Sequence, residues 1–194
     1  MKLKNKYIIL RHGQTTYQIK KKKLAYPWPE KSPIILTDKG IKQVELSAKK
    51  LKKEKIDLVY SSDVYRTKYT AGIIMENLKV KGRVIFDKRL RDVNLGVFRG
   101  KPREQFFDIF PKFSEKWFYE KPKGGESWTD CQERVASFLK EIDKKRKNKI
   151  ILIVSHGDPL WLLEGAVKGL GNKDLVARKK KSFLKTGSFK KLNY

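Results

Sequence analysis

The chain has 194 residues, of which 39% are hydrophobic and 11% aromatic. This is the length of one ordinary domain, and its apolar residues suffice for a real core, so the composition excludes a disordered chain. No apolar run approaches the roughly 20 residues of a membrane-spanning helix. The net charge of +26 predicts attraction to anionic partners.

The positive charge is spread along the whole chain. Most of the 47 basic residues are lysines, and only Lys20–Lys23 and Lys179–Lys181 form dense runs. A general preference for lysine over arginine explains this pattern at least as well as a nucleic-acid-binding surface does. Nucleic acid is therefore not the partner we expect.

The start of the chain and its cysteine content indicate a cellular compartment. The four apolar residues Tyr7–Leu10 are fewer than the roughly 7 to 15 in the apolar region of a signal peptide. The single cysteine, Cys131, excludes an intramolecular disulfide, which agrees with a reducing environment. We expect a cytoplasmic protein without membrane association, and we expect Cys131 to lie in the core.

The first half of the chain alternates apolar runs with amphipathic segments. Tyr7–Leu10 ends before an arginine-histidine-glycine triplet and predicts a buried parallel strand. A helix is predicted after Thr37, because apolar residues recur there at helical spacing: Ile41, Val44, Ala48 and Leu51. Asp57–Tyr60 and Arg83–Phe86 predict two further strands, with a helix between them.

The second half of the chain continues this alternation. Ser127 and Asp130 predict a capping box that opens a helix. The apolar face of this helix is Trp128, Cys131, Val135, Phe138 and Ile142. Ile150–Val154 predicts a second buried parallel strand, and Ser188–Leu192 alternates like an edge strand. The whole pattern predicts an α/β fold, a three-layer α/β/α sandwich with a mainly parallel central sheet and an antiparallel edge strand.

Two segments interrupt the alternation, Lys20–Pro33 and Val97–Gly125. We expect residues 1–194 to form one domain, with an excursion or lid at about 97–125. Ligands of open parallel sheets bind beyond the carboxyl ends of the strands, so both segments are predicted to wall a site. The aromatic residues of the second segment suit either a satellite core or a lid that excludes water: Phe106, Phe107, Phe110, Phe113, Trp117, Phe118 and Tyr119.

The chain has two histidines, and each lies directly after an apolar strand and directly before a glycine. Parallel strands would bring His12 and His156 to one rim of the sheet. A neutral imidazole held in line can attack phosphorus, and glycine lets a ligand approach the backbone closely. Arg11 and Arg66 are candidates to clamp the phosphoryl oxygens, because a planar guanidinium holds them bidentately.

Helix starts support the same interpretation. Arg66 is predicted in the first turn of a helix, and helix N-termini favour anions. Asp158 is predicted to cap the helix that follows His156, with Pro159 in its first turn. This arrangement would place His156 to donate a hydrogen bond to a phosphate.

Five motifs in this order resemble those of the histidine phosphatase superfamily, the phosphoglycerate-mutase-like clan. They are Arg11-His12-Gly13-Gln14-Thr15, Leu36-Thr37-Asp38-Lys39-Gly40, the segment from Ser61 to Ala71, Gly125-Glu126-Ser127 and Ser155-His156-Gly157. The likeness covers nearly the whole chain. It implies that His12 becomes phosphorylated while Arg11, Arg66 and His156 line the phosphate pocket.

The resemblance also suggests further substrate-binding residues and some departures. Thr15 and Gly157 lie in the matching motifs, and Gln18 stands where many relatives carry asparagine, although its amide could still contact the phosphoryl group. Asp158 stands where many phosphatases of the family have a second glycine. No metal or organic cofactor is implied.

The proton donor is left open between two carboxylates. The family usually places glutamate where this chain has Asp92, and Glu126 is the alternative by motif. A carboxyl with a raised pKa in a partly apolar pocket could protonate the departing alcohol and later activate water. A plain loop carboxylate is the competing interpretation of Asp92.

The resemblance implies phosphomonoester hydrolysis through phosphohistidine, with a small phosphorylated acidic metabolite as substrate and a histidine acid phosphatase-type monoesterase as the enzyme. A 2,3-bisphosphoglycerate-dependent phosphoglycerate mutase is the alternative, but such mutases usually carry an extra segment for which this chain lacks room. A basic nucleic-acid-binding or scaffold protein on the same fold is the second alternative. The intact His12, Arg11, Arg66 and His156 argue against that one.

Overall fold

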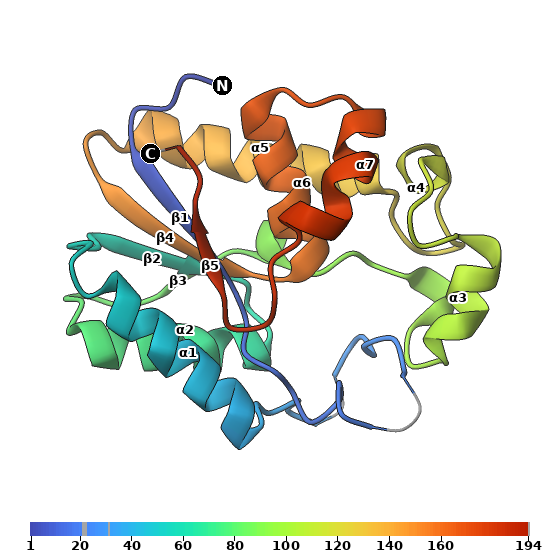
Figure 1. Ribbon diagram of the computed structural model, residues 1–194, viewed down its shortest axis with the longest axis horizontal. Coiled ribbons are helices and arrows are strands. Elements are labelled where there is room, and N and C mark those ends of the chain that lie inside the picture. The colour runs from blue at the N-terminus through green and yellow to red at the C-terminus, as the bar shows by residue number, and fades with distance from the viewer. Residues whose placement is uncertain (21–22, 31, 194) are drawn as a thin grey trace.

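A five-stranded sheet runs through the middle of the computed structural model, which describes residues 1–20, 23–30 and 32–193 (Figure 1). The strands are β1 (Lys6–Arg11), β2 (Leu58–Ser61), β3 (Ile85–Phe86), β4 (Ile150–Ser155) and β5 (Phe189–Lys191). Their order across the sheet is β3-β2-β4-β1-β5. β5 pairs antiparallel with β1, and the other pairs are parallel. The predicted mainly parallel sheet with an antiparallel edge strand is confirmed.

The register of the two central strands places the histidines side by side. Arg11 at the end of β1 pairs with Ser155 at the end of β4, and the His12 amide donates to the Ser155 carbonyl at 3.1 Å. His12 and His156 therefore leave the sheet at the same carboxyl edge. At the far edge, β3 is shorter than the predicted strand Arg83–Phe86, because only two of its residues pair with β2.

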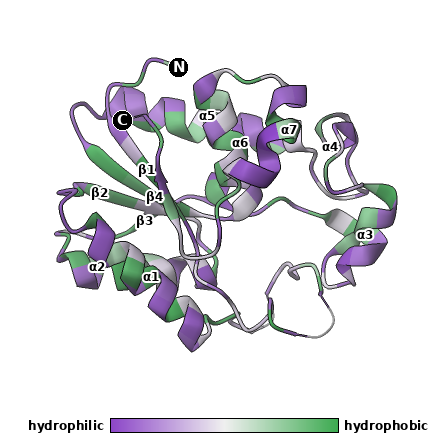
Figure 2. Ribbon diagram, viewed as in Figure 1, coloured by the Kyte–Doolittle hydropathy of each residue, from purple (hydrophilic) through white to green (hydrophobic). Residues whose placement is uncertain are grey.

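Helices cover both faces of the sheet. α1 (Asp38–Leu51) and α2 (Tyr65–Leu78) lie on one face, and α5 (Trp128–Lys145) and α6 (Gly157–Lys168) lie on the other, with α7 (Asn172–Ser182) beside α6 (Figure 1). Alternate residues of β1 enter the two cores, Ile8 on the side of α1 and Ile9 on the side of α5. Figure 2 shows the hydrophobic strands between these partly hydrophilic helices. The three-layer sandwich is confirmed.

Caps start two of these helices as predicted. Thr37 accepts a hydrogen bond from the Gly40 amide at 3.0 Å, and Ser127 and Asp130 form a reciprocal capping box. The predicted cap of α6 is wrong. His156 occupies the N-cap position with extended backbone, Asp158 lies inside the first turn with Pro159, and the Asp158 carboxylate binds a lysine instead.

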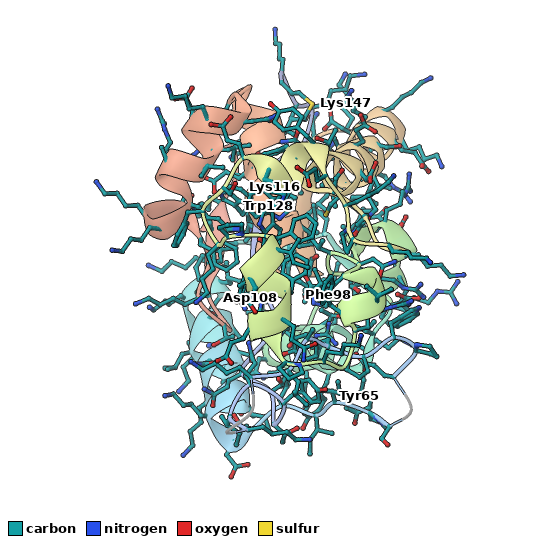
Figure 3. The ribbon with its side chains drawn as sticks, turned by 90° about the vertical axis from the view of Figure 1, so that its right-hand side faces the viewer. Tyr65, Phe98, Asp108, Lys116, Trp128 and Lys147 are labelled. Atoms are coloured by element: carbon teal, nitrogen blue, oxygen red, sulfur yellow. The ribbon has the colours of Figure 1, made fainter. Side chains whose placement is uncertain are left out.

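The segment between β3 and α5 contains only short helices. They are the 3-10 helices η1 (Lys88–Leu90) and η2 (Gly96–Phe98), and the α-helices α3 (Arg103–Ile109) and α4 (Lys116–Tyr119). Figure 3 looks onto this side of the molecule, with Phe98, Lys116 and Trp128 labelled. No helix in the described part of the chain is both long and apolar enough to cross a membrane.

The aromatic residues of this segment mostly form a satellite core. Phe106, Phe110, Trp117 and Phe118 are buried together with Trp128, Cys131 and Trp161. Phe113 and Tyr119 are instead 58% and 72% exposed. Cys131 is buried, as expected. The satellite core thus accounts for most of the aromatic residues.

Candidate active site

A cavity of about 330 Å³ opens beside the carboxyl edge of the sheet. Arg11, His12, Arg66 and Asp92 line it. Its walls come from both interrupting segments, with Tyr26, Trp28 and Glu30 from the first and Phe106, Phe107 and Trp117 from the second. Lys21, Lys22 and Lys31 of the first segment lie outside the described residues.

His12 is buried at the bottom of this cavity, 1% exposed. Its Nδ1 lies 2.8 Å from the Gly13 carbonyl oxygen. Because a carbonyl can only accept, Nδ1 carries the proton and the neutral ring keeps a lone pair on Nε2. Burial, followed by the charges of Arg66 and Arg11, lowers the pKa of His12 well below its ordinary value. The ring is thus neutral, and its contact with the Gly13 carbonyl holds it in one orientation.

The second imidazole lies next to the first, with 5.2 Å between the ring centroids. His156 is fully buried, and its Nε2 lies 3.1 Å from the Ser62 hydroxyl oxygen. Its Nδ1 has no hydrogen-bond partner within the described residues. Burial, followed by the charge of Arg66, lowers the pKa of His156 well below its usual range. A neutral ring that accepts from Ser62 would carry its proton on the unpartnered Nδ1.

Two arginines contribute donors that the described residues leave unused. Arg11 donates from Nη1 to the Leu184 carbonyl at 2.8 Å, while its Nε is buried and unpartnered. Arg66 donates to Glu30, and its buried Nε is also unpartnered. Nearly all buried polar groups in proteins find a partner, so donors that are left unused in this way are suited to binding a ligand. Converging guanidinium and imidazole donors specify an anion.

The motif glycines are required by packing at this site. A Cβ at Gly13 would lie 2.5 Å from the Gly40 carbonyl oxygen, so these two motifs meet backbone to backbone. A Cβ at Gly157 would collide with the Phe183 ring and lie 3.2 Å from Cζ of Arg11. The expected reason for glycine was close approach of a ligand, whereas the observed reason is close approach of the protein to itself.

Asp92 lies between Arg66 and His156. Its Oδ2 is 4.0 Å from Arg66 Nη2 and 3.9 Å from His156 Nδ1, and 31% of its side chain is accessible. Burial raises the pKa of Asp92, and the Arg66 charge opposes this effect. A carboxyl in this position can hold a proton beside the donors of Arg66 and His156.

Glu126 also lines the cavity, but its carboxylate is already engaged. It accepts from Arg134 Nε at 2.9 Å and from the Asn94 amide at 2.9 Å. These bonds tie the start of α5 to the loop that carries Asp92. The geometry therefore favours Asp92 over Glu126 as the group free to move a proton.

Thr15 and Gln18 are bound to each other. Gln18 Oε1 accepts from the Thr15 amide at 3.0 Å, and the buried Thr15 hydroxyl lies 2.8 Å from that of Tyr26. Gln18 lines the cavity, whereas Thr15 lies behind Tyr26. Of the two, only Gln18 is positioned to meet a ligand directly.

The sequence motifs gave no indication of Tyr26 or Glu30. The Tyr26 ring stacks on the Arg66 guanidinium at 3.9 Å, and the Glu30 carboxylate pairs with the same group. Both lie in the segment rich in lysine and proline that matched no motif. Only the prediction that this segment walls a site pointed to them.

The model of the histidine phosphatase superfamily (branch 1) matches residues 7–182. The chain belongs to this superfamily. The match spans both histidines and the whole sheet except β5, which agrees with the geometry of the cavity.

Individual relatives of this histidine phosphatase superfamily member carry both phosphatase and mutase names. Phosphoserine phosphatase 1 of Hydrogenobacter thermophilus is 32% identical over 139 residues, 70% of this chain and 65% of the relative. Phosphoglycerate mutase-like protein 4 of Arabidopsis thaliana is 32% identical over 77% of this chain and 65% of its own length. The chain thus spans less than two thirds of each of these proteins. The solved structure of Bacillus stearothermophilus YhfR has a TM-score of 0.79 at 25% identity, covering 95% of this chain and 89% of that one.

Proposed function

We propose that this chain hydrolyses small phosphomonoesters through a phosphohistidine formed on His12. The observation that carries the proposal is the state of His12, a neutral ring whose Nδ1–H donates to the Gly13 carbonyl and whose Nε2 is hydrogen-bonded to no described residue. Around it lie donors from Arg11, Arg66 and His156 that have no partner within the described residues. This set suits the charged equatorial oxygens of a transferring phosphoryl group.

The first half of the reaction transfers the phosphoryl group to the protein. His12 Nε2 attacks phosphorus, the bond from phosphorus to the alcohol oxygen breaks, and the proton of Asp92 goes to that oxygen. Arg11, Arg66 and His156 hold the phosphoryl oxygens. The alcohol then leaves, and Asp92 is left as a carboxylate.

The second half returns the site to its starting state. The Asp92 carboxylate takes a proton from water as the water oxygen attacks phosphorus, and the bond from phosphorus to nitrogen breaks. Inorganic phosphate leaves and His12 is neutral again. We further propose a monoesterase of the histidine acid phosphatase type, in which Asp92, whose pKa burial raises, is the proton donor.

The residues that line the cavity support a substrate whose alcohol portion carries a carboxylate. Arg99 and Arg103 line the cavity, and neither forms an ion pair with any described carboxylate. Arg103 lies over the Phe107 ring at 5.6 Å. A guanidinium without an acid partner suits a substrate carboxylate. The name phosphoserine phosphatase 1 supports a small acidic substrate as well.

Phosphate release separates the proposal from its alternatives. Wild type should release inorganic phosphate from p-nitrophenyl phosphate and from 3-phosphoglycerate, and an acid-labile phosphoryl group should be trapped on the protein. His12→Ala should lose both while keeping its circular dichroism spectrum and melting temperature. Isomerisation of 3-phosphoglycerate without phosphate release would instead establish a mutase. Absence of both activities, with steeply salt-dependent DNA binding, would favour a nucleic-acid-binding protein.

A further inference from the structure

Lys179 is a buried cation beside the satellite core, and it has no role in the proposed phosphoryl transfer. The Nζ of Lys179, on α7, lies 3.8 Å from the centroid of Trp128 and 4.3 Å from that of Trp161. The residue is only 9% exposed, and burial lowers the pKa of its ammonium. A buried ammonium is costly unless it is paired, although aromatic faces attract it. The indole rings therefore hold this ammonium in one place.

The partner of this ammonium is the carboxylate of Asp158. Lys179 Nζ donates to Asp158 Oδ1 at 2.7 Å. This bond holds Oδ1 of the carboxylate against α7. The pair joins α6 to α7, and its acid lies two residues after His156.

The carboxylate also belongs to the wall of the catalytic cavity. Asp158 lines it together with Arg11, Asp92 and Phe183, and 21% of its side chain is accessible. No described residue donates a hydrogen bond to its second oxygen. If the ion pair only joined α6 to α7, its carboxylate would not need to be accessible from the cavity. Oδ1 is held by Lys179, whereas Oδ2 has no described donor and belongs to a carboxylate that lines the cavity. A carboxylate held in this way is preorganised to accept a hydrogen bond from a ligand.

We propose that Asp158 is a specificity-determining residue that accepts a hydrogen bond from a hydroxyl or ammonium group on the alcohol part of the substrate. This inference rests on the proposed phosphatase function and narrows its substrate class. With Arg103 on the same cavity wall, the site fits alcohols that carry a carboxylate and a neighbouring donor. It disfavours alcohols that present a second anion to the α6 side.

Three phosphomonoesters with one skeleton test the inference. O-phosphoserine, 3-phosphoglycerate and 3-phosphooxypropanoate share a carboxylate and differ only at the middle carbon, which carries ammonium, hydroxyl or hydrogen. In wild type, kcat/KM for the better of the two donor substrates should exceed that for 3-phosphooxypropanoate about tenfold to hundredfold, the range of one hydrogen bond to a charged group. The ranking of the two donor substrates then identifies the preferred donor.

Asp158→Asn is the matching variant. Its amide oxygen can still accept from Lys179, which leaves the amide nitrogen, a donor, facing the cavity. The preference for donor substrates should fall at least tenfold. Glu141→Gln should keep it, because this acid of α5 pairs with Lys145 and Arg89 and does not line the cavity.

The outcomes separate the two proposals. A ratio of kcat/KM near one between the donor substrates and 3-phosphooxypropanoate in wild type would overturn the role of Asp158. A ratio that is unchanged in Asp158→Asn would overturn it as well. The first comparison uses wild type alone and so does not depend on whether a variant folds. Absence of turnover on all three esters and on p-nitrophenyl phosphate overturns the phosphatase function itself.

Discussion

At the scale of single residues, the proposed nucleophile is held by the backbone. The partner of His12 Nδ1 is the carbonyl of Gly13, which does not titrate, whereas many catalytic histidines are oriented by a carboxylate. The ring therefore keeps its tautomer over the whole pH range in which it is neutral. The limits of activity then depend on when His12 gains a proton and when Asp92 loses one.

The pH dependence follows from the signs of these two shifts. The pKa of His12 lies well below 6.5, so the free lone pair survives into acidic solution. Burial raises the pKa of Asp92 above its ordinary value, and the proton that would go to the alcohol is lost as pH rises through this raised pKa. For an alkyl phosphate, kcat/KM should therefore be greatest in acid and decline toward alkaline pH. A profile that instead rises through pH 7 would contradict these assignments.

Asp92→Asn should distinguish good from poor leaving groups. An alkoxide needs a proton to leave, whereas p-nitrophenolate does not, so the variant should lose about 10²-fold or more of kcat/KM on an alkyl phosphate. The loss on p-nitrophenyl phosphate should be clearly smaller. Glu126→Gln, measured on both substrates, is the control. Equal losses of Asp92→Asn on the two esters would reject Asp92 as the proton donor.

Glu30 offers a further prediction, because its carboxylate pairs with Arg66 where phosphoryl oxygens are proposed to bind. Glu30→Gln removes the competing charge and should tighten inhibition by inorganic phosphate severalfold. The inhibition constants of wild type and variant at constant ionic strength test this. An unchanged or weaker inhibition would mean that Glu30 supports the anion site instead of competing for it.

At the scale of elements, the sequence predicted helices and strands that depend on neighbouring residues, but it did not predict contacts between residues far apart in the chain. The strand Ile150–Val154, observed as Ile150–Ser155, and the helix after Ser127 were predicted because an apolar run and a capping box involve residues close together in the chain. The cap at Asp158 was predicted wrongly because its partner, Lys179, lies 21 residues away on another helix. The contact between Glu30 and Arg66 was missed for the same reason, since it spans 36 residues.

The satellite core of the second segment predicts unequal costs for two phenylalanines. Phe106 is 2% exposed and packs on Trp117 with 4.5 Å between centroids, whereas Phe113 is 58% exposed. Phe106→Ala should lower the free energy of unfolding by about 3 to 5 kcal/mol. Phe113→Ala should change it by less than about 0.5 kcal/mol. Urea unfolding of both variants measures this, and a small effect at Phe106 would mean that the segment is a loosely attached lid.

At the scale of the whole molecule, the net charge of +26 adds to the charge of the arginines that line the cavity. Such a field accelerates the encounter with an anionic ester, and salt screens it over about 10 Å at 0.1 M. We expect kcat/KM for 3-phosphoglycerate to fall severalfold between low and high ionic strength, with little change in kcat. A kcat/KM that ignores salt would show that the charge serves another purpose.

The pairing of β1 with β4 has a consequence for how this fold changes its chemistry. The separation of the two histidine rings follows from the spacing of adjacent strands, about 4.8 Å, and owes nothing to the segments that wall the cavity. Selection or engineering can therefore exchange Lys20–Pro33 or Val97–Gly125 for segments of other length and composition while the two imidazoles stay side by side. New substrates can then evolve on an inherited reaction.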